Sequence, residues 1–137
     1  MAKSVASGRD ILLMALNGII PVWFQQPMFI ALHNADPTAS GLANAFETVY
    51  GGYARVAISP VTGSNGWSVV NNIASNNQLT LFPMCNAGGD TITNWSLTTA
   101  LTGPSEILYT SALAAPLVVA PYIQPQFPQG SLIIQEG

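Results

Sequence analysis

The scarcity of charge is the feature that most constrains what this chain can fold into. Only 7% of its 137 residues are Asp, Glu, Lys or Arg, while 49% are hydrophobic, and residues 56–89 and 107–135 contain no charged side chain. Typical soluble domains carry about 25% charged residues, and charges of both signs normally keep a monomer dispersed. Protein interfaces, in contrast, are depleted of charge at their centres. We therefore expect much of the surface to lie against other protein; a neutral, polar, monomeric β domain is the alternative.

In the charge-free segments, the surface must be built from Asn, Gln, Ser, Thr and backbone, with Asn72, Asn76 and Gln129 as examples. The composition also excludes whole classes of function. Three Lys and Arg against six Asp and Glu give a formal net charge of −3, which excludes a basic surface for nucleic acid. One Cys excludes an internal disulfide framework, and one His excludes a metal cage of several His. We expect no catalytic site, no metal and no cofactor.

The residues that could carry chemistry have ordinary structural explanations. His33 and Asp36 could join a serine in a hydrolase triad, but a G-x-S-x-G motif is missing. We expect His33 to end a strand and to cap the following turn with its ring. Cys85 follows an apolar stretch and has no positive group near it in the sequence, so we expect a small core residue rather than a nucleophile. The remaining carboxylates are scattered through turns, and no glycosidase pair can be nominated from their spacing.

The N-terminal residues predict a short helix. Ser7-Gly8-Arg9-Asp10 fits a capping box with Ser7 as N-cap, and Gly18 is a plausible residue to end the helix. Almost every face of this helix is apolar, so it cannot lie in water. We predict an arm over residues 1–26, whose helix plugs the end of the domain or docks on a neighbour.

The apolar run 11–24 is the one candidate for a membrane or signal segment. It contains fourteen residues, whereas about 20 are needed to span the hydrocarbon layer. Asp10 directly precedes the run, which is unlike a signal peptide. We therefore expect no membrane partner.

From residue 27 onward the pattern is that of β-structure. Short apolar or alternating segments recur at intervals of about ten residues and are separated by Gly, Pro, Asn and Asp; they are 28–33, 53–59, 67–70, 78–82, 91–97, 107–113 and 131–135. Four of the ten prolines lie within 116–128, where we expect only edge strands or extended loops. The sequence predicts an all-β, single domain over 27–137, a β-sandwich or jelly roll.

The aromatic residues suggest where the chain contacts a partner. Trp67 and Trp95 lie in alternating strands, where large rings usually fill the core. Trp23 and Phe24 lie outside the regular strands, and protein interfaces favour aromatic anchors. Together with the apolar helix they give the candidate interaction residues, which are Ile11, Leu12, Leu13, Trp23 and Phe24.

Several short stretches resemble a known group of proteins. They are FIALHNADP (29–37), GGYARVA (51–57), GWS (66–68), ILYTSAL (107–113) and GSLII (130–134). In this order they are similar to small virion proteins of tailed bacteriophages, labelled tail-fibre-like or capsid decoration (cement) proteins. The resemblance covers roughly residues 29–135 and implies an assembly subunit with a β-sandwich or jelly-roll fold and no activity or cofactor.

Our leading hypothesis is a capsid decoration protein on the outside of the phage head. It would clamp neighbouring copies of the major capsid protein and associate with itself as a homodimer or homotrimer. The first alternative is a tail-fibre or baseplate subunit that contacts the host, with the loop 34–52 as a possible tip. The second alternative is a secreted carbohydrate-binding module or small hydrolase.

Overall fold

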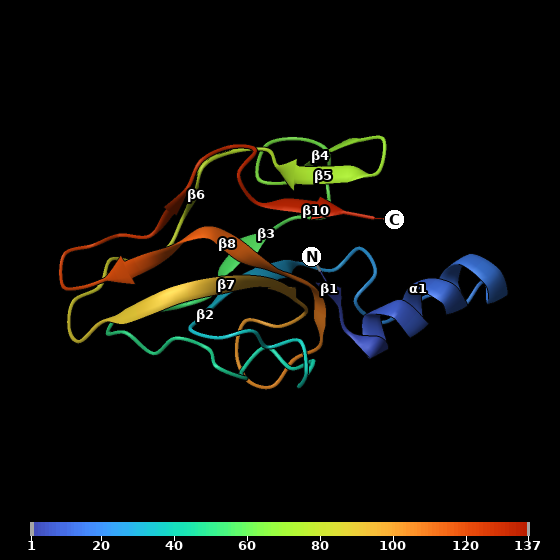
Figure 1. Cartoon of the computed structure of the whole chain (residues 1–137). Coiled ribbons are helices and arrows are strands. Elements are labelled where there is room, and N and C mark those ends of the chain that lie inside the picture. Colours follow the sequence, from blue (N-terminus) through green and yellow to red (C-terminus); the bar gives the residue numbers. More distant parts are fainter. Residues whose placement is uncertain (1, 137) are drawn as a thin grey trace.

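The structure is a computed structural model that describes residues 2–136. It contains one helix, α1 (Val5–Asn17), and strands that form antiparallel sheets (Figure 1). In chain order the strands are β1 (Ala2–Lys3), β2 (Met28–His33), β3 (Val56–Ile58), β4 (Trp67–Val70), β5 (Ile73–Asn76), β6 (Thr80–Leu81), β7 (Asp90–Thr98), β8 (Ile107–Val119), β9 (Gln126–Phe127) and β10 (Ile133–Gln135).

The largest sheet has the strand order β1-β8-β7-β2-β3. Strand β2 lies inside it, between β7 and β3, and its last four residues are all buried. Because both neighbours of β2 are strands of this sheet and its side chains are covered, its sequence reads as an unbroken apolar run rather than an alternating one. Strands β7 and β8 form the long central pair of the sheet.

Two small sheets complete the fold, with the orders β10-β5-β4 and β6-β9. One buried cluster joins residues of all three sheets: Trp95 and Leu97 of β7, Trp67 and Ile134 of the three-stranded sheet, and Phe127 of β9. The core therefore lies between the large sheet and the two small ones, as expected when sheets bury their apolar faces on one another.

Close approach of the backbone requires a glycine before β4. A Cβ on Gly66 would lie 2.1 Å from the carbonyl oxygen of Val61, and the Trp67 N–H donates to that same oxygen at 2.9 Å. Any larger residue at this position would push the turn away from the strand.

The prediction of an all-β fold with a short N-terminal helix is confirmed, and the jelly-roll topology stays a prediction. Trp95 and Trp67 both lie in the core, as expected. The division into an arm over 1–26 and a domain over 27–137 stays a prediction; its end residues, Met1 and Gly137, lie outside the described residues.

The predicted start of the helix is wrong. Ser4 is the N-cap, and its Oγ accepts a hydrogen bond from the Ser7 N–H at 3.0 Å. Both serines have the right chemistry for a cap, but the one that precedes Val5 lies where β1 ends, so the helix begins three residues earlier. The predicted end is confirmed: Gly18 has φ 67° and its N–H bonds to the Leu13 carbonyl.

One further expectation needs correction, and one predicted strand is longer than expected. Asn76 is only 1% exposed, not part of the surface, and it ends β5, a strand that the sequence did not predict. Strand β8 continues through Pro116 to Val119. Its pairing with β7 shifts register between Ile92 and Asn94, so the proline stands at an irregularity, one of the places that tolerate it in a sheet.

Candidate functional site

The N-terminal arm projects from one end of the molecule (Figure 1). It leaves the large sheet at β1, which pairs with β8, and returns to the same sheet at β2. After Gly18 the chain reverses through a turn in which the Phe24 N–H bonds to the Pro21 carbonyl. Because both ends of the arm are held by strands, the arm is a fixed projection of the fold.

The inner face of α1 is polar. Ser7 and Asp10 are its two buried residues, and they lie three positions apart, on one side of the helix. Asp10 Oδ2 accepts a hydrogen bond from Trp23 Nε1 at 3.0 Å, and Asp10 Oδ1 accepts from Arg9 Nη2 at 2.7 Å. We call these three residues, Arg9, Asp10 and Trp23, the Asp10 clasp. It ties the helix to the returning segment.

The pKa values of two carboxyl groups near the clasp are shifted in opposite directions. The hydrogen bond from Trp23, followed by the one from Arg9, lowers the pKa of Asp10. At the start of β8, burial and the neighbouring Asp10 carboxylate raise the pKa of Glu106. The Glu106 Oε1 atom is buried without a hydrogen-bond partner. Both effects disfavour the charged form of the half-buried Glu106 side chain.

The outer face of α1 exposes three apolar side chains next to the exposed Arg9. Val5, Leu12 and Leu16 lie on the side of the helix opposite Ser7 and Asp10, and they are 93%, 59% and 77% exposed. A helix on the surface of a globular protein normally has the reverse arrangement, with its apolar stripe toward the core. Helix α1 is therefore an amphipathic helix that presents its apolar side to the outside.

The predicted interaction residues fall in two groups. Leu12 and Phe24 are exposed, as a contact surface requires. Ile11, Leu13 and Trp23 are half-buried, and Trp23 also packs against the core cluster. The indole of Trp23 thus holds the arm together through the clasp, and the role of all five residues in binding a partner stays a prediction.

Sequence reasoning missed most of the exposed large apolar residues of the arm. Besides Val5 and Leu16 on α1, these are Ile19, Ile20 and Val22, which follow the helix. The signal was present, because residues 11–27 contain no charge and positions 12 and 16 share a helix face. We name Leu12, Leu16, Ile19, Ile20 and Val22 the outer arm surface.

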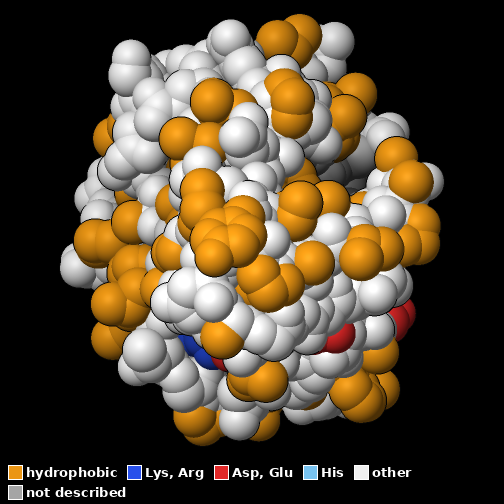
Figure 2. Space-filling model, turned by 90° about the vertical axis from the view of Figure 1, so that its left-hand side faces the viewer, with side chains coloured by type: hydrophobic (Ala, Val, Ile, Leu, Met, Phe, Trp, Pro, Cys, Tyr) orange, Lys and Arg blue, Asp and Glu red, His pale blue; other side chains and the backbone are white. Residues whose placement is uncertain are grey.

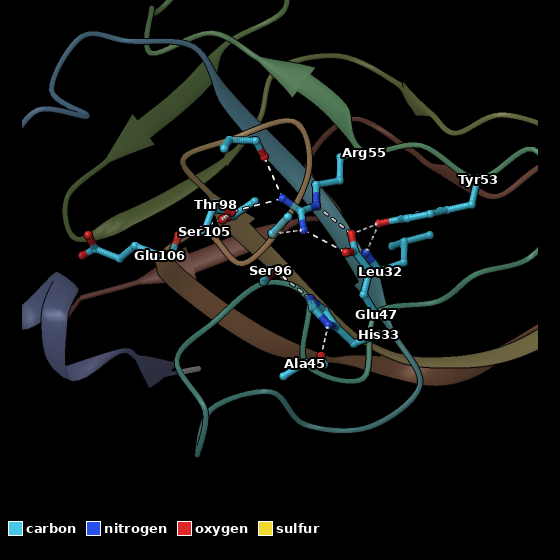
Figure 3. Close-up of polar contacts among 12 residues, drawn as sticks. Leu32, His33, Ala45, Glu47, Tyr53, Arg55, Ser96, Thr98, Ser105 and Glu106 are labelled. Atoms are coloured by element: carbon cyan, nitrogen blue, oxygen red, sulfur yellow. Dashed lines mark hydrogen bonds and ion pairs between the residues drawn. The ribbon is translucent and has the colours of Figure 1, made fainter.

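The buried polar residues elsewhere have structural roles (Figure 3). His33 Nδ1 lies 2.9 Å from the Ala45 carbonyl oxygen and Nε2 lies 2.7 Å from Ser96 Oγ. Because a carbonyl only accepts, Nδ1 carries the proton and Nε2 accepts from the serine hydroxyl. Burial lowers the pKa of His33, so the ring is held neutral. It fastens the long loop to the sheet, and Asp36 bonds to Thr38 instead of joining a triad.

Arg55 forms the other buried network. Its guanidinium donates to both carboxylate oxygens of Glu47, at 2.7 and 2.8 Å. The remaining N–H groups bond to the Ala100 and Gly103 carbonyls and to Ser105 Oγ. All five donors of the guanidinium are used, so the loop 34–52, the start of β3 and the turn before β8 are joined at one side chain.

The described residues carry few groups suited to chemistry. Cys85 is fully buried, as predicted, and its Sγ donates to the Ala87 carbonyl at 3.3 Å. Within residues 2–136, no group of three or more His, Cys, Asp or Glu is placed to hold a metal ion. No helix in this range has the length and hydropathy needed to cross a bilayer.

The three cationic side chains are all engaged in ion pairs: Lys3 with Glu136, Arg9 with Asp10, and Arg55 with Glu47. Figure 2 shows the end of the molecule remote from α1, where hydrophobic side chains are spread over the face and charged atoms appear only in small spots. This pattern suits contacts with neutral protein surfaces.

Comparison with known proteins identifies the family of the chain. A search of the curated proteins finds no match. The family model described as podophage GP4 fiber I protein gp80 matches residues 6–135, a range that takes in the arm as well as the β-structure. The chain therefore belongs to the family of podophage GP4 fiber I protein gp80, a tailed-phage virion family.

Proposed function

We propose that this protein is a fibre subunit of a tailed phage, that it acts by binding and not by catalysis, and that its N-terminal arm is the assembly contact. The observation that carries the proposal is the match to a fibre family over nearly the whole chain. The exposed apolar side of α1 supports the second part, because contiguous apolar surface on a soluble protein marks an interaction site.

The loop 34–52 supports a contact with the host. It exposes Leu42, Phe46 and Val49, while Glu47 and the backbone at Ala45 are fixed by the Arg55 and His33 networks. Binding residues are commonly carried on loops that a rigid scaffold positions. We assign this loop to recognition and the arm to assembly; residues 38–42 of the loop lie beside the start of α1.

A capsid decoration protein is the second candidate. It would lie on the capsid exterior and bridge copies of the major capsid protein. The specific observation in its favour is that exposed apolar residues occur both on the arm and far from it (Figure 1), on β6 (Leu81) and in the segment between β8 and β9 (Tyr122 and Ile123). A clamp between two capsid subunits needs two such contacts.

Localisation in the phage particle distinguishes the two candidates. The experiment labels purified virions with antibodies against this chain, images them by electron microscopy, and measures copies per particle by quantitative mass spectrometry. Label on a fibre, with a few copies per particle, is the expected result. Label over the head with hundreds of copies would replace the fibre role by decoration, and absence from the virion would overturn both.

A further inference from the structure

An apolar hollow opens beside the root of the arm. It has a volume of about 460 Å³ and lies between the large sheet and the three-stranded sheet. Trp67, Leu97 and Ile134 form its buried floor, and Val61, Val69 and Ile73 are exposed at its rim. Sites that take organic or peptide groups have volumes of about 300–1,000 Å³ and mainly apolar linings. We name these six residues the apolar hollow.

The hollow has almost no charge. Among the described residues that line it, Glu136 is the one Asp, Glu, Lys or Arg. Its carboxylate pairs with Lys3, with a distance of 2.7 Å between Nζ and Oε1. The outer arm surface is likewise uncharged, since residues 11–27 contain no Asp, Glu, Lys or Arg. The two surfaces therefore match in polarity, and neither would leave a charge unpaired on contact.

The arm does not fill the hollow of its own chain. None of the residues that line the hollow belongs to residues 2–27, and α1 points away from the sheets (Figure 1). The strands at both ends of the arm prevent it from turning round. Lys3, directly before the helix N-cap, is nevertheless paired with the hollow's Glu136. The outer arm surface and the apolar hollow thus lie at the same end of the molecule. Each copy can therefore insert its own arm into a neighbour and accept the neighbour's arm.

The areas agree with a stable contact. Burying one aliphatic side chain removes about 60–120 Å² from water, so the five partly exposed residues of the outer arm surface offer roughly 350 Å². The hollow exposes less area than the arm, so one arm in one hollow buries about 500 Å² in total, and two reciprocal contacts bury about 1,000 Å², the lower limit for a specific interface. A single contact alone would be small for a stable complex.

We propose that the outer arm surface of one copy docks in the apolar hollow of a second copy, giving a closed assembly in which every arm is covered. This inference rests on the proposed function, because it names the partner of the arm in fibre assembly. Closed homo-oligomers are the usual form of small subunits with self-complementary surfaces.

Disulfide trapping tests the contact directly. Full-length Val22→Cys is mixed with full-length Val69→Cys under mild oxidation, and cross-linked peptides are identified by mass spectrometry. Both positions are exposed, and the native Cys85 is buried. The control is a mixture of Val22→Cys and Val118→Cys, because Val118 is exposed near the C-terminal end of β8 and does not line the hollow. We expect the first pair to cross-link about tenfold more than the control pair. Equal yields from the two mixtures would overturn the inference.

The oligomeric state gives a second readout. The full chain should sediment as an oligomer, and Ile20→Glu and Val69→Glu should each weaken association about tenfold or more, while the matched Val118→Glu leaves it unchanged. Circular dichroism confirms that each variant is folded. A monomeric wild-type chain that is still found on phage fibres would overturn the arm exchange and leave the proposed function standing. If the chain forms an oligomer with the predicted cross-link but is absent from virions, the arm exchange stands and the proposed function is overturned.

Discussion

At the scale of single residues, Arg55 is the side chain on which most of the polar framework depends. Its side chain is 2% exposed and its carboxylate partner Glu47 is 15% exposed. We expect Arg55→Met to lower the free energy of unfolding by about 3–5 kcal/mol, because the buried Glu47 carboxylate is left without a counter-charge. Lys3→Met breaks an exposed ion pair and should cost less than about 1 kcal/mol. Urea unfolding of both variants measures the difference, and equal losses would refute this account.

His33 makes stability depend on pH. Burial lowers the pKa of the folded imidazole below its unfolded value of about 6.5. Below that pH His33 binds a proton in the unfolded chain but stays neutral in the folded chain. The free energy of unfolding therefore falls as pH decreases from about 7 to 5. His33→Asn keeps a donor toward the Ala45 carbonyl and removes the titration. Thermal unfolding across this range should show a smaller slope for the variant; identical slopes would contradict the assignment.

At the scale of elements, sequence patterns predicted what local chemistry determines. Strands β2 and β4 lie where apolar runs end at turn residues, and α1 ends at the predicted glycine. Strand β5 was missed because its last residue, Asn76, looks like surface. Two of the partners that bury Asn76 are distant in sequence: its Oδ1 accepts from the Leu132 N–H at 2.9 Å, and its Nδ2 donates to the Pro128 carbonyl at 3.0 Å. No local window contains them.

The same limit applies to the candidate site. Sequence reasoning found the apolar arm, because a run of uncharged residues beside a capping motif is a local signal. It did not find which side of α1 faces out, because that is decided by the bond between Asp10 and Trp23, thirteen residues apart. It chose Trp23 as an intermolecular anchor; the structure shows Trp23 half-buried and bonded to Asp10, and its role in binding a partner stays a prediction.

The Asp10 clasp gives a prediction for the arm as an element. Asp10→Ala removes the acceptor for Trp23 and the partner of Arg9, so the arm should open locally more often without global unfolding. Trypsin cleavage after Arg9 should then be several-fold faster than in the wild type. Asp90→Ala is the matched control, since this carboxylate bonds to Asn34, outside the arm. Unchanged cleavage in the Asp10 variant would show that the strands alone fix the arm.

At the scale of the whole molecule, the low charge determines how association responds to salt. With three cations that are all paired internally and no charged residue in the outer arm surface or at the rim of the hollow, contacts between copies gain little from Coulomb attraction. We expect the association constant to be unchanged between 50 mM and 1 M sodium chloride, where an electrostatic interface would weaken by screening. Sulfate, which strengthens the burial of apolar surface, should raise it. Cooling should lower it, because the hydrophobic driving force weakens at low temperature. Sedimentation velocity in these buffers provides the measurement, and dissociation by sodium chloride would mean that ion pairs, not apolar surfaces, hold the copies together.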